Sequence, residues 1–284
     1  MRHVGLLVLG SFINSLGTGL TAFGLAVIML RAHGTASSVA VIQMSAFAPL
    51  VLLAPLAGIL ADRYDRRLMM IIGDAGSVLG LGLILAALSS PRPSLAWVCT
   101  GAVLSSCLAA LTEPALRASV TDLVTEEDYV RSSGLLQLAS AAKYLLAPAA
   151  AGFLMPLVGV RGLVLLDAST CLVTVGCTMT VRRALAAGAS QRAAAQPGGD
   201  HDLLAGWRTI TASPGLRTLV ALMTLATLAI GVIQVLIKPI LLPTVTTSEM
   251  GMIETVAATG MLVGAALVTA WKSAQPTTLL AAGL

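Results

Sequence analysis

The chain carries at residues 58–67 the stretch GILADRYDRR, a charged turn set between two long apolar runs. Run 38–61 before it holds no charged residue, and run 69–89 after it holds a single acid, Asp74. Each run reaches the length of about 20 residues that an α-helix needs to cross the hydrocarbon core of a bilayer. A short turn with two acids and three arginines between such runs predicts a hairpin of membrane helices whose turn lies at the membrane surface.

The rest of the sequence repeats this pattern. Hydrophobic residues make up 57% and charged residues 11% of the 284 residues, and the mean hydropathy is +0.92, whereas soluble domains carry about 25% charged residues. Spans in lipid are helices or closed barrels, and these runs are too long for barrel strands of about ten residues. We therefore expect an all-α integral membrane protein. The expected spans are 4–30, 38–61, 69–89, 95–116, 132–158, 163–181, 216–243 and 253–271, with a ninth that begins near Thr277.

The basic residues predict the orientation of these spans. When the connections are numbered alternately from the N-terminus, twelve lysines and arginines fall on the side of the N-terminus. Only Arg31, Arg92 and Arg161 fall on the other side. Because connections on the cytoplasmic side are enriched in lysine and arginine, we expect a multi-pass protein of the inner or plasma membrane with a cytoplasmic N-terminus.

One long polar stretch divides the chain. Residues 182–215 are rich in small and polar residues, which is typical of a flexible linker. Within them, residues 202–210 have the pattern of a short amphipathic helix on the cytoplasmic surface. We expect a six-helix transmembrane half over 1–181, a cytoplasmic linker over 182–215, and a partial second half over 216–284 with two spans and the start of a third.

The reactive side chains do not predict an enzyme. The four cysteines lie inside apolar runs and the three histidines lie outside them, so we expect no metal site, no cofactor and no disulfide framework. A membrane-embedded hydrolase would need a nucleophile and a base, or metal ligands, within the spans. Nothing in the sequence predicts a nucleic acid as partner.

Residues 58–67 resemble the signature loop of the major facilitator superfamily, Gly-x-Leu-Ala-Asp-Arg-x-Gly-Arg-Arg, with Asp65 in place of the second glycine. With an aspartate at this position, the stretch resembles the same loop in the drug–proton antiporter branch, which includes macrolide efflux proteins. Six further stretches agree with this resemblance, residues 114–118, 122–127, 133–135, 147–152, 167–170 and 213–217. The resemblance implies a helical bundle of two six-helix halves with twelve spans in all, of which this sequence would supply a complete first half and a C-terminally truncated second half.

The resemblance also implies roles for the charged turn. Its gating residues would be Gly58, Asp62, Arg63, Arg66 and Arg67. The aspartate would hold the two halves together on the cytoplasmic side, and Gly58 would let a neighbouring helix approach closely. A stop-transfer cluster that only fixes topology is the alternative. We also expect the acidic loop 117–131 to pair with this turn.

The fifth span retains part of a further family motif. The glycine–proline packing motif of the family is represented in this span by Pro148 and Gly152. The fourth span lacks the arginine that antiporters of the superfamily often carry, which weakens the resemblance to an antiporter there.

Polar residues at membrane depth are costly and are therefore candidates for function. The candidates for a polar cavity or for ion coupling are Lys143, Asp74, Glu113, Gln137 and Asn14. Lys143 lies about three turns into its span. We expect Asp74, Glu113 and Asp167 to lie close enough to span ends to reach the interface, and Lys238 to pair with Glu254. For Lys143 the alternative is a side chain that extends toward the membrane surface, and for the uncharged Gln137 and Asn14 it is a hydrogen bond between helices.

Together these observations predict a secondary active transporter that works by alternating access. The branch resemblance favours proton-coupled export of a small amphipathic molecule or drug, with protons, the small-molecule substrate and the lipid bilayer as partners. Uptake of a nutrient is one alternative, and a non-transporting membrane fragment or scaffold is another. Because the chain supplies about eight of twelve spans, we expect that it does not transport alone.

Overall fold

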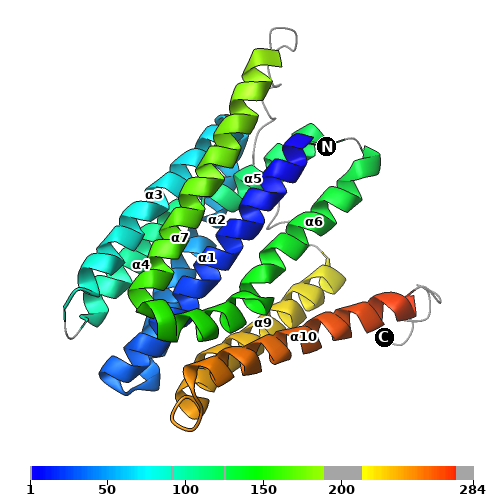
Figure 1. The fold of residues 1–284 in the computed structure, drawn as a ribbon. Coiled ribbons are helices and arrows are strands. Elements are labelled where there is room, and N and C mark those ends of the chain that lie inside the picture. The colour runs from blue at the N-terminus through cyan, green and yellow to red at the C-terminus, as the bar shows by residue number, and fades with distance from the viewer. Residues whose placement is uncertain (1, 91–92, 125, 189–212, 273–284) are drawn as a thin grey trace.

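The computed structural model describes residues 2–90, 93–124, 126–188 and 213–272 (Figure 1). The expected amphipathic helix over 202–210 and the ninth span near Thr277 lie outside these residues. Every element in the described part is a helix, which confirms the all-α prediction. The helices are α1 (Arg2–His33), α2 (Ala36–Arg63), α3 (Arg66–Ala87), α4 (Leu95–Ala109), α5 (Thr112–Leu123), α6 (Glu126–Leu145), α7 (Ala147–Gly188), α9 (Pro214–Leu241) and α10 (Thr247–Lys272).

Two expected spans are interrupted at prolines. The fourth span, expected as one helix over 95–116, consists of α4 and α5 and extends to Leu123. Pro114 has no N–H to donate to the Ala110 carbonyl, which explains the break between the two helices. The fifth span is likewise divided into α6 and the first part of α7, because Pro148 cannot donate to the carbonyl four residues before it.

The expected outer loop between the fifth and sixth spans is almost absent. The element α7 consists of two helices that meet almost directly at Gly159, whose φ of 68° lies outside helical geometry. Glycine adopts this left-handed conformation without steric cost. A positive φ also occurs at Gly34, where it is 66° and the chain turns from α1 into α2. These two glycines reverse the chain at one end of the bundle. We call it the opposite end, because it lies opposite the basic end described next.

The other side of the bundle, which we call the basic end, holds the turn Tyr64–Asp65, the end of α5 and Arg182. Helix α1 packs along the length of the bundle between α7, α6 and α2, and α3 packs against α4 and α7. Glycines let α3 and α4 approach closely, since a Cβ on Gly101 would lie 2.8 Å from the Gly80 carbonyl oxygen.

Helices α9 and α10 join this bundle at the opposite end (Figure 1). The last turns of α9 and the residues after it, including Ile237, Leu241 and Val245, pack against the main core cluster. The apolar side chains nearer the start of α9, such as Leu219, Leu225 and Val232, are exposed. Within the described residues, the contacts of α9 and α10 with the first six spans are therefore concentrated at one end.

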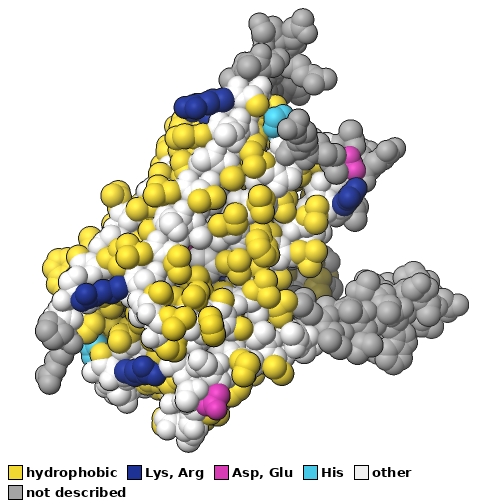
Figure 2. All heavy atoms as spheres, viewed as in Figure 1, with side chains coloured by type: hydrophobic (Ala, Val, Ile, Leu, Met, Phe, Trp, Pro, Cys, Tyr) yellow, Lys and Arg dark blue, Asp and Glu magenta, His cyan; other side chains and the backbone are white. Residues whose placement is uncertain are grey.

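The surface between the two ends is apolar, as a membrane protein requires. Figure 2 shows hydrophobic side chains over the middle of the visible face and charged side chains near its ends. Five described segments are long and apolar enough to cross a membrane: His3–His33, Ala36–Ala61, Arg66–Ala87, Leu95–Leu123 and Ala147–Leu185. Helix α6 is not among these segments, because its sequence includes glutamates, serines, a glutamine and Lys143. A polar helix packed against α1 is a natural place for a polar site.

Candidate transport site and gating contacts

Asp65 organises the turn at the basic end. Its Oδ1 accepts a hydrogen bond of 3.0 Å from the backbone N–H of Arg67 and so caps the N-terminus of α3. Its Oδ2 lies 2.9 Å from Nε of Arg182 near the end of α7. Partial burial alone would raise the pKa of Asp65, but the Arg182 and backbone hydrogen bonds outweigh it and leave the pKa lowered. The residue that departs from the family pattern therefore joins the third helix to the sixth span.

Arg66 joins the same turn to α5. Its guanidinium lies 2.5 Å from the Asp122 carboxylate and also donates a hydrogen bond of 3.1 Å to the Ala118 carbonyl. The expected pairing of the basic turn with segment 117–131 is confirmed for this pair. The segment itself is not a loop, because α5 continues to Leu123 and α6 begins at Glu126. The end of α5 is thus fixed to the turn.

The other expected gating residues make fewer contacts. The side chain of Asp62 lies outside the described part of the structure. Arg63 is exposed and Arg67 is half-buried. A Cβ added to Gly58 would meet no described atom within 4 Å, so the expected close helix approach at Gly58 is absent from the described residues. The gating role of this group stays a prediction.

A second group of contacts closes the opposite end between α7 and α10. A Cβ on Gly152 would lie 2.9 Å from the Thr247 carbonyl oxygen and 3.2 Å from Cα of Gly251. The Ser248 hydroxyl donates a hydrogen bond of 2.9 Å to the Gly152 carbonyl. The Pro148 carbonyl lies against Gly251 in the same way. The structure thus places both residues of the expected packing motif, Pro148 and Gly152, against the eighth span.

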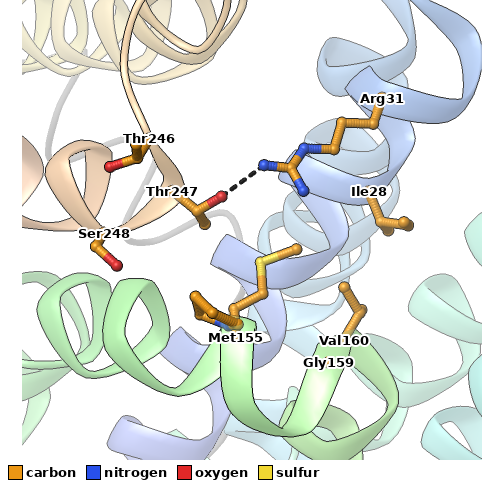
Figure 3. Close-up of a pocket in the computed structure, with 9 residues that line it drawn as sticks. Ile28, Arg31, Met155, Gly159, Val160, Thr246, Thr247 and Ser248 are labelled. Carbon is orange, nitrogen blue, oxygen red and sulfur yellow. Dashed lines mark hydrogen bonds between the residues drawn. The ribbon is translucent and has the colours of Figure 1, made fainter.

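Arg31 extends this closure toward α1. Its guanidinium donates a hydrogen bond of 2.6 Å to the Thr247 hydroxyl across a hollow of about 490 Å³ (Figure 3). Met155 and Val160 line the apolar side of this hollow, and Ser248 lines its polar side.

The expected pair between α9 and α10 is also present. Nζ of Lys238 lies 2.5 Å from Oε1 of Glu254, with only 7% and 16% of the two side chains exposed. The ammonium also lies 5.4 Å from the centre of the Phe23 ring on α1. A buried pair of this kind fixes α9 to α10 and brings both against α1.

Lys143 lies at mid-depth of the bundle. It is the eighteenth residue of α6, about 25 Å along that helix at a rise of 1.5 Å per residue. Its ammonium lies 5.3 Å from the centre of the Phe47 ring on α2 and 5.6 Å from that of Tyr144. The Asp167 and Glu113 carboxylates lie within electrostatic range. Carboxylates from α5 and α7 therefore lie within electrostatic range of this one lysine on α6.

The expected position of Asp167 near the interface is wrong. Only 3% of the residue is exposed, and a Cβ on Gly17 in the middle of α1 would lie 2.8 Å from its Oδ1. Thr21 lies beside the same carboxylate. Neither Asp167 Oδ1 nor the Thr21 hydroxyl has a hydrogen-bond partner among the described residues. The structure thus buries a carboxylate whose Oδ1 has no hydrogen-bond donor within the described ranges.

Three of the remaining candidates lie in two separate places. Glu113 is exposed and pairs with Arg117 at 2.7 Å, and Arg117 also reaches the Gln137 side chain at 3.5 Å. Glu113 therefore lies at the surface of the described chain, and its position at the membrane interface stays a prediction. Asn14 instead accepts a hydrogen bond of 3.4 Å from the Cys171 thiol between α1 and α7.

The expectation that Asp74 reaches the interface is also wrong. It is 1% exposed on α3, where its Oδ1 accepts a hydrogen bond of 3.0 Å from the Thr112 hydroxyl. A Cβ on the preceding Gly73 would touch this hydroxyl at 2.5 Å, so the glycine lets α3 lie directly against the break between α4 and α5.

Sequence reasoning did not select Asp65, Arg182, Asp167 or Thr21 as site residues. The position of Asp65 does indicate a structural role, since an aspartate just before a helix is a favoured N-cap. Asp167 was recognised as a charge in a span, but its depth depends on how α7 packs against α1. Arg182 and Thr21 have no distinctive local pattern.

Comparison with known proteins assigns this fold to a family. The model of the Major Facilitator Superfamily matches residues 7–284. The chain belongs to this superfamily. A solved POT family transporter, in complex with a thioalcohol-conjugated peptide, is similar with a TM-score of 0.55 and 16% identity. The match covers 82% of this chain and 47% of the POT family transporter, so this chain spans about half the length of its structural neighbour. No curated protein matches. Members of this family are transporters, and the present chain is a multi-pass membrane protein.

Proposed function

We propose that this superfamily chain forms part of a secondary active transporter that exports a small amphipathic molecule in exchange for protons. The observation that supports this proposal most is that Lys143 and the buried Asp167 lie within electrostatic range of each other inside the bundle, with Glu113 also in range at the surface. Ionisable groups in the bilayer interior are costly and are kept where ions or substrates pass. A purely structural bundle would not need them.

The uneven contacts along the bundle support alternating access. The Gly152–Gly251 approach and the Arg31–Thr247 hydrogen bond close the opposite end. At the basic end, the described ion pairs Asp65–Arg182 and Arg66–Asp122 remain within the first six spans. The concentration of basic residues there supports a cytoplasmic location for this end and for the N-terminus. The proposed state is therefore one that is closed toward the outside.

The proposed site lies on the face formed by α5, α6 and α2. Lys143 supplies a charge, and Phe47 and Tyr144 supply aromatic surface that is 38% and 45% exposed. Apolar surface with few fixed polar groups suits an amphipathic ligand. Glu113 and Gln137 extend the polar part of this face. The gate at the basic end is assigned to Gly58, Asp62, Arg63, Arg66 and Arg67.

An accumulation assay in an efflux-deficient bacterium tests this function. It compares this chain with a version extended by four spans from a related protein, each with Lys143→Met or Asp62→Asn. Lys143→Arg keeps the charge, and Trp97→Phe is a control at an exposed position of α4. The proposal predicts that the extended chain lowers accumulation of an amphipathic dye, that both test variants abolish this effect, and that Trp97→Phe retains it. Higher accumulation with the extended chain would instead support uptake. No change with any compound would support a scaffold.

A further inference from the structure

The break between α4 and α5 lies against a buried acid that the proposed transport site does not use. Asp74 is 1% exposed, and its Oδ2 has no hydrogen-bond partner among the described residues. None of the ion pairs described in the structure involves it. An ionised carboxylate without a counter-charge is too costly to bury by several kcal/mol. Something must neutralise Asp74.

The surroundings of Asp74 supply oxygen atoms rather than cationic side chains. The Thr112 hydroxyl donates a hydrogen bond of 3.0 Å to Asp74 Oδ1. A Cβ added to Gly73, the residue before Asp74, would lie 2.9 Å from the Leu108 carbonyl oxygen. Ser77 lies one turn further along α3 and bonds to backbone carbonyls. From α7, Cys171 lies within electrostatic range of both Asp74 and Asp167. No described lysine, arginine or histidine is paired with the acid.

The adjoining helix is interrupted, as helices around ion sites in transporters often are. The Leu111 N–H bonds to the Leu108 carbonyl three residues back instead of four, at 3.1 Å. Pro114 leaves the Ala110 carbonyl without its helical donor. This break lies against Gly73, the residue before Asp74, and it gives the region a point at which α5 can move relative to α4.

We propose that Asp74, with Thr112 and the backbone at the α4–α5 break, binds a small monovalent cation, a proton or a sodium ion. The site lies between α3 and α5, inside the first six spans, about 12 Å from the start of α3. This inference deepens the proposed ion-coupled transport and rests on it for its role. This site would separate ion binding from the substrate face. Because Thr112 and Asp122 both belong to α5, release of the ion would be linked to movement of α5 and to its ion pair with Arg66 in the charged turn.

Infrared spectroscopy of the purified full chain tests the proton. A protonated carboxyl group gives a C=O stretching band that shifts in D₂O, and a proton bound at this site predicts such a band at neutral pH. Asp74→Asn removes one such band. Asp167→Asn is the matched control at another buried acid and leaves the Asp74 band in place. Thr112→Val shifts the band without removing it, which reports on the hydrogen bond even if the Asn variant folds poorly.

Thermal unfolding in sodium chloride and in choline chloride tests sodium. If sodium is the ligand, it raises the Tm of the wild-type chain by roughly 5 °C at about 100 times its Kd, and Asp74→Asn loses this rise. The inference is overturned if no carboxyl band depends on Asp74 and sodium has no Asp74-dependent effect. Neither measurement requires transport, so this failure would leave the proposed transport function standing, and a failed transport assay would leave the cation site standing.

Discussion

Replacing Asp65 tests whether the turn at the basic end stabilises the bundle as described. Asp65→Ala removes an N-terminal cap, worth about 1 kcal/mol, and an ion pair with Arg182. Since the partners are 40% and 44% exposed, that pair contributes only about 0.2–1 kcal/mol. The free energy of unfolding should therefore fall by about 1–2 kcal/mol.

Two further variants separate these contributions. Asp65→Asn keeps a side chain that caps as well as aspartate does, so it should lose only the ion-pair part. Arg182→Ala should cost the same as Asp65→Asn. Combining the two should cost no more than either alone, because they remove one shared interaction. Asp65→Gly, which restores the family pattern, should lose only a few tenths of a kcal/mol of the capping contribution in addition to the pair.

The assay is equilibrium unfolding of the purified chain in mixed micelles, repeated across pH. The Asp65 contacts lower its pKa, so their contribution is fully present above the unfolded pKa of about 3.9 and is lost as the pH falls through the lower folded value. The difference between wild type and Asp65→Ala should thus be constant from neutral pH down to about pH 5. If Arg182→Ala destabilises Asp65→Asn as much as it destabilises wild type, the described pair does not act in solution.

Three further outcomes follow from the described contacts. Reversing Arg66 or Asp122 should each lower transport by the extended chain, and the charge-swapped double variant should restore part of it. Failure of that rescue in an accumulation assay would count against a role of the pair in gating. Lys238→Met should destabilise the chain by about 3–5 kcal/mol because it leaves Glu254 buried and unpaired, whereas adding Glu254→Gln should recover much of that loss in the same unfolding assay. Gly152→Ile should force α7 and α10 apart, which spin-label distances at the opposite end would detect; an unchanged distance would refute the close contact.

The features that depend on composition were predictable from the sequence. Long uncharged runs specify membrane helices because lipid leaves no other partner for the backbone, and the expected spans agree with the helices to within a few residues at most ends. The breaks near Ala110 and Leu146 were missed even though Pro114 and Pro148 are visible in the sequence. An apolar run gives no sign of whether a proline only kinks a helix or ends it.

The candidate site was less predictable, because burial depends on which helices pack together. Asp74 and Asp167 were placed near the interface by counting residues from the span ends. The structure buries both, because Gly73 and Gly17 let neighbouring helices cover them. The Lys238–Glu254 pair was anticipated, as was a pairing of the basic turn with segment 117–131, because in each case the two partners flank the same membrane surface. Asp65–Arg182 joins residues 117 positions apart, and nothing local indicates such a contact.

The central claim, ion-coupled transport with Lys143 at its site, is tested most directly in inside-out vesicles that contain the extended chain. A pH gradient is imposed, and entry of an amphipathic fluorescent compound is followed with and without a protonophore. The account predicts entry that requires the gradient, is abolished by Lys143→Met and persists in part with Lys143→Arg. Entry that is independent of the gradient, or equal in wild type and Lys143→Met, would contradict it.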